Sequence, residues 1–133
     1  MRNRPMARLY FLLPVITLFL IVGCDGGDKV QHQVSYSQEI IPILQKHCLE
    51  CHVPDAPGQL ASGLDMSTHA LLMKGTKFGP VIKAGDSLSS TLIILVEGRA
   101  DPSIKMPHGD RPSLSANEIK TLRQWIDQGA ANN

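Results

Sequence analysis

Large aromatic side chains are scarce in this chain of 133 residues. They make up 5% of the sequence, and half of them fall within the first 23 residues. The rest of the chain keeps only Tyr36, Phe78 and Trp125. A domain of about 100 residues with so few large side chains and so many loops has a thin hydrophobic core. We expect such a domain to be stabilised around a large apolar cofactor.

Cysteine is also rare, and its distribution argues against several common sites. The chain has three cysteines, of which Cys48 and Cys51 form one CxxC pair. A structural zinc site needs four ligands, usually two pairs separated in sequence, but no second CxxC or HxxxH follows and His69 and His108 stand alone. A thioredoxin-like dithiol begins a helix after a strand, whereas this pair follows a predicted helix. No Ser/His/Asp or paired-carboxylate arrangement stands out, so the sequence predicts no enzyme.

No excess of positive charge is present to attract nucleic acid. Without the three arginines of residues 1–23, ten basic residues face twelve acidic ones, a net charge of −2 with histidine neutral. A nucleic-acid-binding domain typically shows a basic patch. We therefore expect no nucleic-acid partner.

The N-terminus has the pattern of an export signal. A basic start precedes an almost continuous apolar run, Leu9–Val22, which is interrupted by Pro14. As a helix this run is roughly 21 Å long, short of a hydrocarbon core of about 30 Å, although an uncleaved anchor remains an alternative. The segment "LIVGC" resembles a bacterial lipobox, which predicts cleavage before Cys24 and lipidation of its thiol; otherwise Cys24 is a small residue near a cleavage site.

These features divide the chain into three parts. Residues 1–23 are predicted to be a lipoprotein signal peptide, 24–33 a flexible tether, and 34–133 one folded domain. The predicted location is the bacterial cell envelope, lipid-anchored and facing the periplasm, with the choice of inner or outer membrane open.

Helix end signals predict an all-α domain. We expect one helix after an N-cap at Ser37, one from Ser67 to Gly75, one from Asp86 or Ser87 to near Gly98, and a last one capped by Ser115. In the last helix Ser115 and Glu118 form a capping box, and Ile119, Leu122, Trp125 and Ile126 share one face. The intervening Gly/Pro-rich segments are predicted to be loops.

The stretch "KHCLECH" carries the chemistry. Two thiols three residues apart followed by a histidine form the attachment motif of c-type haem. Cys48 and Cys51 can form thioethers with the two haem vinyl groups. His52, four residues after Cys48, can then reach the iron from the same side. The export signal agrees, because this attachment takes place outside the cytoplasm.

The sixth iron ligand has several candidates. A methionine opposite histidine suits electron transfer. Met66 and Met73 lie beside or inside a predicted helix, where ordinary packing accounts for them. Met106 lies in the loop "IKMPHGD", where Pro107 can hold the backbone extended. His108, two residues further on, is the rival ligand.

From Val34 to Ala131 the sequence resembles a class I-type cytochrome c domain, and most of all the planctomycete-type c-type cytochrome domains. The resemblance rests on "IIPILQKHCLECH", "SGLDMSTHALLMKG", "GPVIKAGDSLSSTLI", "KMPHG" and "LSANEIKTLRQWIDQGA". It implies a small cytochrome c-like fold in which several short helices and long loops wrap around one covalently bound haem c.

The resemblance also implies roles for individual residues. Cys48 and Cys51 would hold the haem covalently, with His52 as proximal and Met106 as distal ligand. Trp125 and Leu122 would pack near the haem. Pro80 resembles a proline whose carbonyl accepts a hydrogen bond from the proximal histidine. The family usually shows two prolines after the methionine, and here His108 replaces the second, which keeps the histidine alternative open.

The predicted function is that of a membrane-anchored monohaem c-type cytochrome carrying single electrons between extracytoplasmic redox partners. Contacts with these protein partners would be transient, and no small-molecule substrate is predicted. The alternative is a haem-based sensor or binding module for a small ligand, with an open or displaceable distal site.

Overall fold

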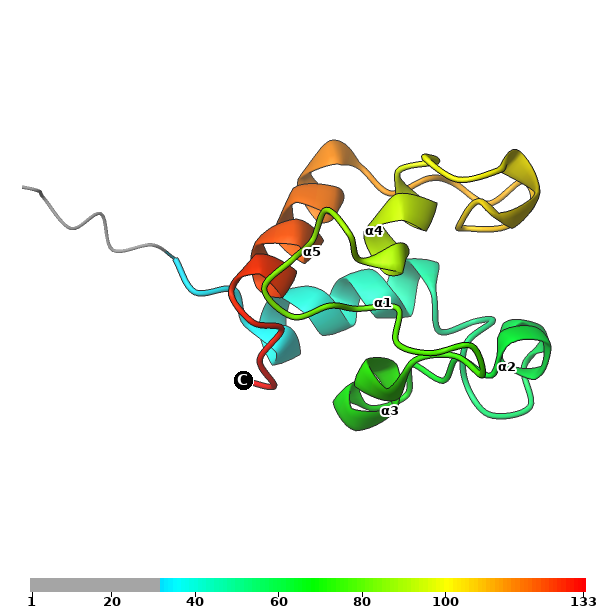
Figure 1. Ribbon diagram of the computed structural model, residues 1–133, viewed down its shortest axis with the longest axis horizontal. Coiled ribbons are helices and arrows are strands. Elements are labelled where there is room, and N and C mark those ends of the chain that lie inside the picture. The colour runs from blue at the N-terminus through cyan, green and yellow to red at the C-terminus, as the bar shows by residue number, and fades with distance from the viewer. Residues whose placement is uncertain (1–31) are drawn as a thin grey trace, which may run out of the picture. The chain divides into compact units, whose positions relative to one another are not determined.

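The computed structural model describes residues 32–133, so the predicted signal peptide, Cys24 and most of the predicted tether lie outside the described residues. In chain order the elements are a π-helical turn η1 (Tyr36–Ile40), α1 (Ile41–His47), α2 (Pro57–Ser62), α3 (His69–Lys74), α4 (Thr91–Val96), a 3-10 turn η2 (Pro102–Ile104) and α5 (Ala116–Asp127) (Figure 1). Between residues 32 and 133 there is no named strand, only an isolated bridge between Thr76 and Gly79. The predicted all-α class is therefore confirmed. None of the helices in this part of the chain is long and apolar enough to cross a membrane.

The first helical segment begins two residues earlier than the sequence predicts. Ser35, not Ser37, is its N-cap, and the Ser35 hydroxyl accepts a hydrogen bond from the Gln38 amide at 3.3 Å. The Glu39 carboxylate in turn accepts from the Ser35 amide at 2.9 Å. The chain makes one π-helical turn before α1 starts, so Pro42 falls in the first turn of α1. Its fixed φ is compatible with the first turn of a helix.

Two predicted N-caps shift toward the helix they precede. The cap of α3 is Thr68 rather than Ser67, and the Thr68 hydroxyl accepts from the Leu71 amide at 3.3 Å. The cap of α4 is Ser90, not Asp86 or Ser87. Asp86 instead stabilises the turn before α4, where its carboxylate accepts from the Ser89 amide at 3.1 Å.

Two short helices, α2 and η2, occur where the sequence predicts loops. Each has a proline in its first turn, Pro57 in α2 and Pro102 in η2. The prediction read these prolines as loop markers, although proline is also common at the first position of a helix. Both elements line the same cavity.

The last helix, α5, agrees with its prediction. Ser115 and Glu118 form the predicted capping box. Leu122, Trp125 and Ile126 are all buried, and Ile119 packs at the edge of the core.

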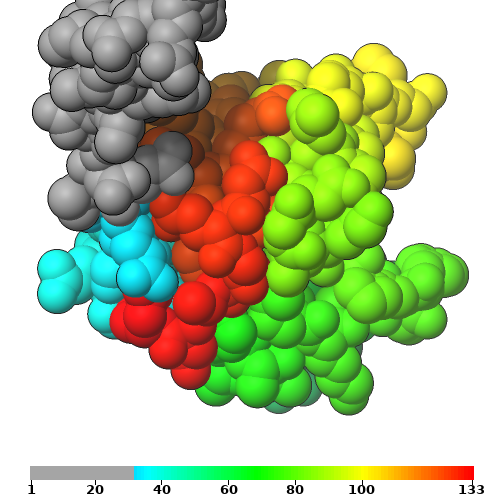
Figure 2. Space-filling view, turned by 60° about the vertical axis from the view of Figure 1, so that its left-hand side comes forward, coloured from blue at the N-terminus to red at the C-terminus, as the bar shows by residue number. Residues whose placement is uncertain are grey.

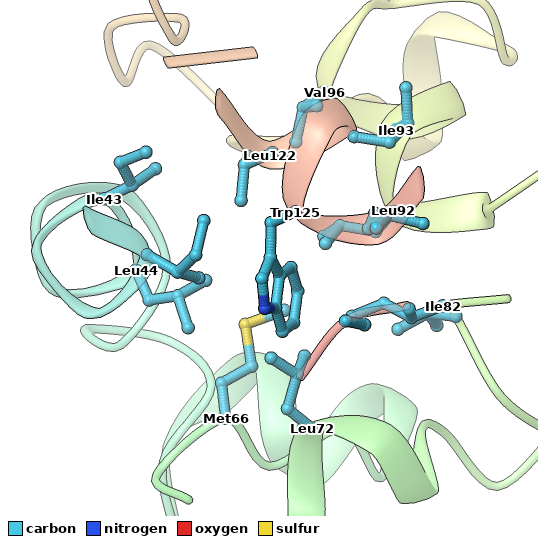
Figure 3. Packing of buried hydrophobic residues seen from close by; sticks show 14 of the residues in the cluster. Ile43, Leu44, Met66, Leu72, Ile82, Leu92, Ile93, Val96, Leu122 and Trp125 are labelled. Carbon is cyan, nitrogen blue, oxygen red and sulfur yellow. The ribbon is translucent and has the colours of Figure 1, made fainter. Parts of the chain in front are cut away.

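Trp125 lies at the centre of the core, between α1, α4 and the segment that contains Met66 (Figure 3). Its indole stacks on Tyr36 with a centroid distance of 5.5 Å, and its Nε1 donates to the Ala131 carbonyl at 2.9 Å. Apolar side chains from α1, α3 and α4 surround it: Leu44, Leu72, Leu92 and Ile93. Tyr36 and Trp125 are therefore packed together in the core, whereas Phe78, the third aromatic of the domain, is 85% exposed.

The two ends of the described chain are joined. The Ser37 amide donates to the Asn133 carbonyl at 2.9 Å, and the Val34 amide donates to the Gln128 side chain at 2.8 Å. Figure 2 shows the first described residues, in cyan, against the C-terminal residues, in red. These hydrogen bonds connect η1 and the residues before it to the end of α5 and the C-terminal residues.

Candidate haem site

A large cavity lies between two walls of the domain. Its volume is about 670 Å³, within the roughly 300–1,000 Å³ typical of small-molecule and cofactor sites. One wall comes from the turn after α1, from α2 and from residues 64–66. The other comes from α4 and from residues 99–114, which we call the distal loop. In Figure 1 the distal loop and α2 lie on opposite sides at the same end of the ribbon.

The turn after α1 brings the two cysteines to this cavity. Helix α1 ends at His47, and the Cys48 carbonyl then accepts from the amides of both Cys51 (3.1 Å) and His52 (3.0 Å). This tight turn places both thiols on the cavity wall, where each is half-buried and free. Burial, with the neighbouring Cys51, raises the pKa of the Cys48 thiol to about 12, so this thiol stays protonated at neutral pH.

His52 is buried, and its ring orientation is fixed by a backbone carbonyl. Its Nδ1 lies 3.3 Å from the Leu64 carbonyl oxygen. Because a carbonyl can only accept, Nδ1 carries the proton, and Nε2 keeps its lone pair for another partner. Burial lowers the pKa of His52, although the Leu64 hydrogen bond opposes this. The ring is thus held in the neutral tautomer that binds metals.

The carbonyl beside His52 is not the one that the resemblance implied. Leu64, not Pro80, supplies the acceptor. Pro80 does line the cavity, but it contributes there as part of the wall. Leu64 is reached because the chain after α2 turns back along the His52 backbone, where the Met66 amide donates to the His52 carbonyl at 2.7 Å.

Sequence reasoning missed Gly58, which allows α2 to pack against this turn. A Cβ at Gly58 would lie 2.7 Å from the Cys51 carbonyl oxygen and 2.9 Å from Cε1 of the His52 ring. Such distances are far shorter than van der Waals contact, so only glycine fits at this position. The pair Pro57-Gly58 is typical of a loop, and no local pattern indicates how close it comes to His52.

The opposite wall carries both candidates for the sixth ligand. Met106 and His108 line the cavity. Met106 is half-buried and packs against the hydrophobic core, and Pro107 after it is buried, whereas His108 is exposed. Met66 also lines the cavity, but it is held on the wall of His52, and Met73 is not among the lining residues.

The resemblance implies that Trp125 and Leu122 pack near the haem, which stays a prediction. Both are 1% exposed, but neither lines the cavity. They lie in the core, while Leu92, Leu95 and Val96 of α4 form the wall itself. The apolar face of α5 is therefore buried as predicted, but the side chains of α4 rather than those of α5 line the cavity.

The residues present fit a covalently attached haem better than a zinc ion. Within residues 32–133 no three Cys, His, Asp or Glu side chains lie close enough together to hold a metal ion. The cavity instead offers two thiols and one imidazole beside a broad apolar surface, and Met106 is among its other lining residues. This donor set suits a flat apolar group held at its edge by thioethers and at its centre by axial ligands.

Comparison with known proteins agrees with this geometry. Residues 48–110 match the profile of a family described as planctomycete cytochrome C. The matched stretch starts at Cys48 and includes Met106 and His108, so it covers the CxxCH motif and both candidates for the sixth ligand. No curated protein and no solved structure matches the chain.

Proposed function

We propose that this protein is a monohaem electron carrier, because residues 48–110 match the planctomycete cytochrome C family. The observation that carries the proposal is the cavity with Cys48, Cys51 and His52 on one wall and Met106 on the other. A bound haem would supply an iron centre that gains and loses one electron, with no bond of a substrate made or broken.

Each residue has a defined task in this proposal. Cys48 and Cys51 would hold the haem edge through thioethers, which their half-buried thiols would form by addition of S–H across the vinyl groups. His52 presents Nε2 to the iron while Leu64 fixes the ring. The apolar side chains of α4 exclude water and lower the local dielectric, which raises the cost of the charged oxidised state. The protein thereby tunes the potential through its ligands and its burial.

Burial favours Met106 over His108 as the sixth ligand. Met106 is packed against the core and is followed by a buried proline, so packing already restricts where its thioether can lie. The imidazole of His108 is exposed and would have to give up its hydration to bind. A thioether ligand also raises the potential relative to a second imidazole.

The cellular setting is part of the proposal. Lipidation of Cys24 after export would tether the domain to a bacterial membrane on the periplasmic side, where haem attachment takes place. The partners would be redox proteins that dock transiently, and no catalysed reaction is proposed. The lipobox-like segment and the CxxCH motif support this setting.

Visible spectra of the protein matured with haem test the proposal. We expect a haem that stays attached on denaturation and a low-spin spectrum with the methionine-to-iron band near the red end. Met106→Ala should abolish that band and open the iron to carbon monoxide. Met73→Ala, away from the cavity, is the matched control and should change neither.

Other results point elsewhere. If His108→Ala rather than Met106→Ala changes the low-spin spectrum, the sixth ligand is His108. A wild-type protein that is already high-spin and binds carbon monoxide supports the sensor alternative. Absence of covalent haem contradicts the proposal as a whole.

A further inference from the structure

The distal loop and the haem-attachment turn are joined by an ion pair. Glu50 lies between Cys48 and Cys51 in the turn, and Arg111 lies in the distal loop that carries Met106. The Arg111 guanidinium binds the Glu50 carboxylate with both of its arms, Nη2 to Oε1 at 2.7 Å and Nε to Oε2 at 3.3 Å. Arg111 also lines the cavity. This pair therefore spans from one cavity wall to the other.

The other polar contacts of the distal loop run to α4 and the turn before it, or stay within the loop. The Met106 amide donates to the Leu95 carbonyl over a long 3.3 Å, and Arg99 Nη2 donates to the Leu88 carbonyl. Lys105 reaches only Ser113, at 3.4 Å, and Asp101 bonds to Ser103. Among residues 32–133, Glu50–Arg111 is the one ion pair between this loop and the wall that carries His52.

The pair is too exposed to matter much for folding. The Glu50 side chain is 75% exposed and that of Arg111 is 43% exposed, and such pairs add little to stability. Its position gives it a different use. A two-armed contact across the cavity restricts how far the loop can move away from the turn, and with haem bound the position of the loop would determine whether Met106 could reach the iron.

We propose that Glu50 and Arg111 form a latch that seats Met106 over the haem and limits access of external ligands to the sixth coordination site. This inference rests on the proposed function. The two residues are positioning residues, because they act through the loop and touch neither a substrate nor the iron.

Imidazole binding to the ferric haem-loaded protein at pH 8, followed by visible spectroscopy, measures the latch. Imidazole is mostly neutral at this pH, so changed protein charges do not steer it. Arg111→Gln, which leaves the CxxCH motif intact, should bind imidazole about two- to five-fold more tightly and faster, as expected from the strength of exposed pairs. Lys83→Gln is the matched control. It breaks the ion pair with Asp86, and because neither residue lines the cavity, imidazole binding should stay unchanged.

Two further measurements separate a latch from a general structural effect. The charge-swapped double variant Glu50→Arg/Arg111→Glu should return to wild-type binding, whereas Arg111→Glu alone should exceed Arg111→Gln. Added salt should raise imidazole binding in the wild type, because exposed pairs are screened, and should leave Arg111→Gln unchanged.

The outcomes distinguish the latch from the proposed function. A wild-type protein with a methionine-ligated haem whose imidazole binding is the same in Arg111→Gln overturns the latch alone. The latch is also overturned if the double variant binds imidazole as tightly as Arg111→Glu does. A wild-type protein without haem, or without a methionine ligand, overturns the proposed function, and the latch falls with it.

Discussion

At the scale of single residues, the His52 ring is held from two sides. The Leu64 carbonyl accepts a hydrogen bond from Nδ1, and the backbone at Gly58 lies close to the ring edge near Cε1. Neither residue provides a ligand, but together they decide where Nε2 lies. Ring orientation set by such neighbours is a common way in which proteins tune a metal-binding histidine.

Gly58→Ala tests this close contact. Helix propensity alone predicts a gain of about 0.5–1 kcal/mol for replacing a glycine inside a helix. We expect the opposite, a loss of about 1–3 kcal/mol, typical of overpacking, because the new Cβ collides with Cys51 and the His52 ring. Chemical unfolding measures the loss, and the visible spectrum of the ferric protein should show a high-spin fraction from a displaced ring.

Leu60→Ala is the control for this prediction. Leu60 also lies in α2, but its side chain is 67% exposed. This variant should keep the low-spin spectrum. A Gly58→Ala protein that is more stable than the wild type with an unchanged spectrum would show that α2 can move away from His52 at no cost.

At the scale of elements, Glu118 joins the start of α5 to the end of α1. Its carboxylate accepts from the Ser115 amide at 2.7 Å, from Lys46 Nζ at 2.9 Å and from His47 Nε2 at 3.2 Å. The His47 side chain is only 3% exposed and lines the haem cavity. The capping box predicted from sequence therefore also fixes the turn that leads into Cys48.

Ser115→Ala tests the cap. Loss of an N-cap hydroxyl costs about 0.5–2 kcal/mol, and we expect the upper half of this range because the Ser115 hydroxyl also donates to Glu118 at 2.8 Å. Urea unfolding measures the change. Asn117→Ala, at an exposed position in the first turn, should change the free energy of unfolding by only a few tenths of a kcal/mol. Equal losses in the two variants would show that the cap is not special.

At the scale of the whole molecule, carboxylates paired with lysines make the free energy of unfolding depend on pH. Lys46, followed by Ser115, holds the pKa of Glu118 well below its usual value, and Lys83 does the same for Asp86. A lowered folded-state pKa contributes stability above the unfolded value, near 4 for these carboxyls, and this stability is lost as pH falls through the folded value.

We therefore expect the free energy of unfolding of the haem-loaded protein to be nearly constant from pH 7 to about 5. Below about pH 4 it should fall continuously. Urea titrations at stepped pH measure this. Glu118→Gln should be less stable at neutral pH and should fall less steeply in acid. A variant as steep as the wild type would show that Glu118 does not contribute to acid unfolding.

The position of the core predicts how the chain behaves without haem. Trp125 and its neighbours pack between α1, α4 and α5, whereas α2 and the distal loop line the cavity. In a haem-free Cys48→Ser/Cys51→Ser protein we expect hydrogen exchange to stay slow in α5 and to become fast in α2 and the distal loop. Equal loss of protection everywhere would show that the core does not fold without the haem.

The sequence by itself determined the donor groups of the candidate site, because its signals are local. Cys48, Cys51 and His52 are neighbours in the chain, and the capping box of α5 needs only four residues. The all-α class followed from such end signals as well. Met106 could be named as a candidate because it lies in a Gly/Pro-rich loop, but the sequence left His108 open.

The tertiary structure decided which groups meet across the chain. Leu64 rather than Pro80 faces His52, Gly58 rather than another residue closes on the ring, and Trp125 packs behind α4 rather than on the cavity. The N-caps also differ from the predicted ones. Ser35 caps η1 with its hydroxyl, whereas Ser90 precedes α4 with its hydroxyl bonded to the Asp86 carbonyl of the preceding turn. These outcomes depend on distances between segments far apart in sequence, which no local pattern encodes.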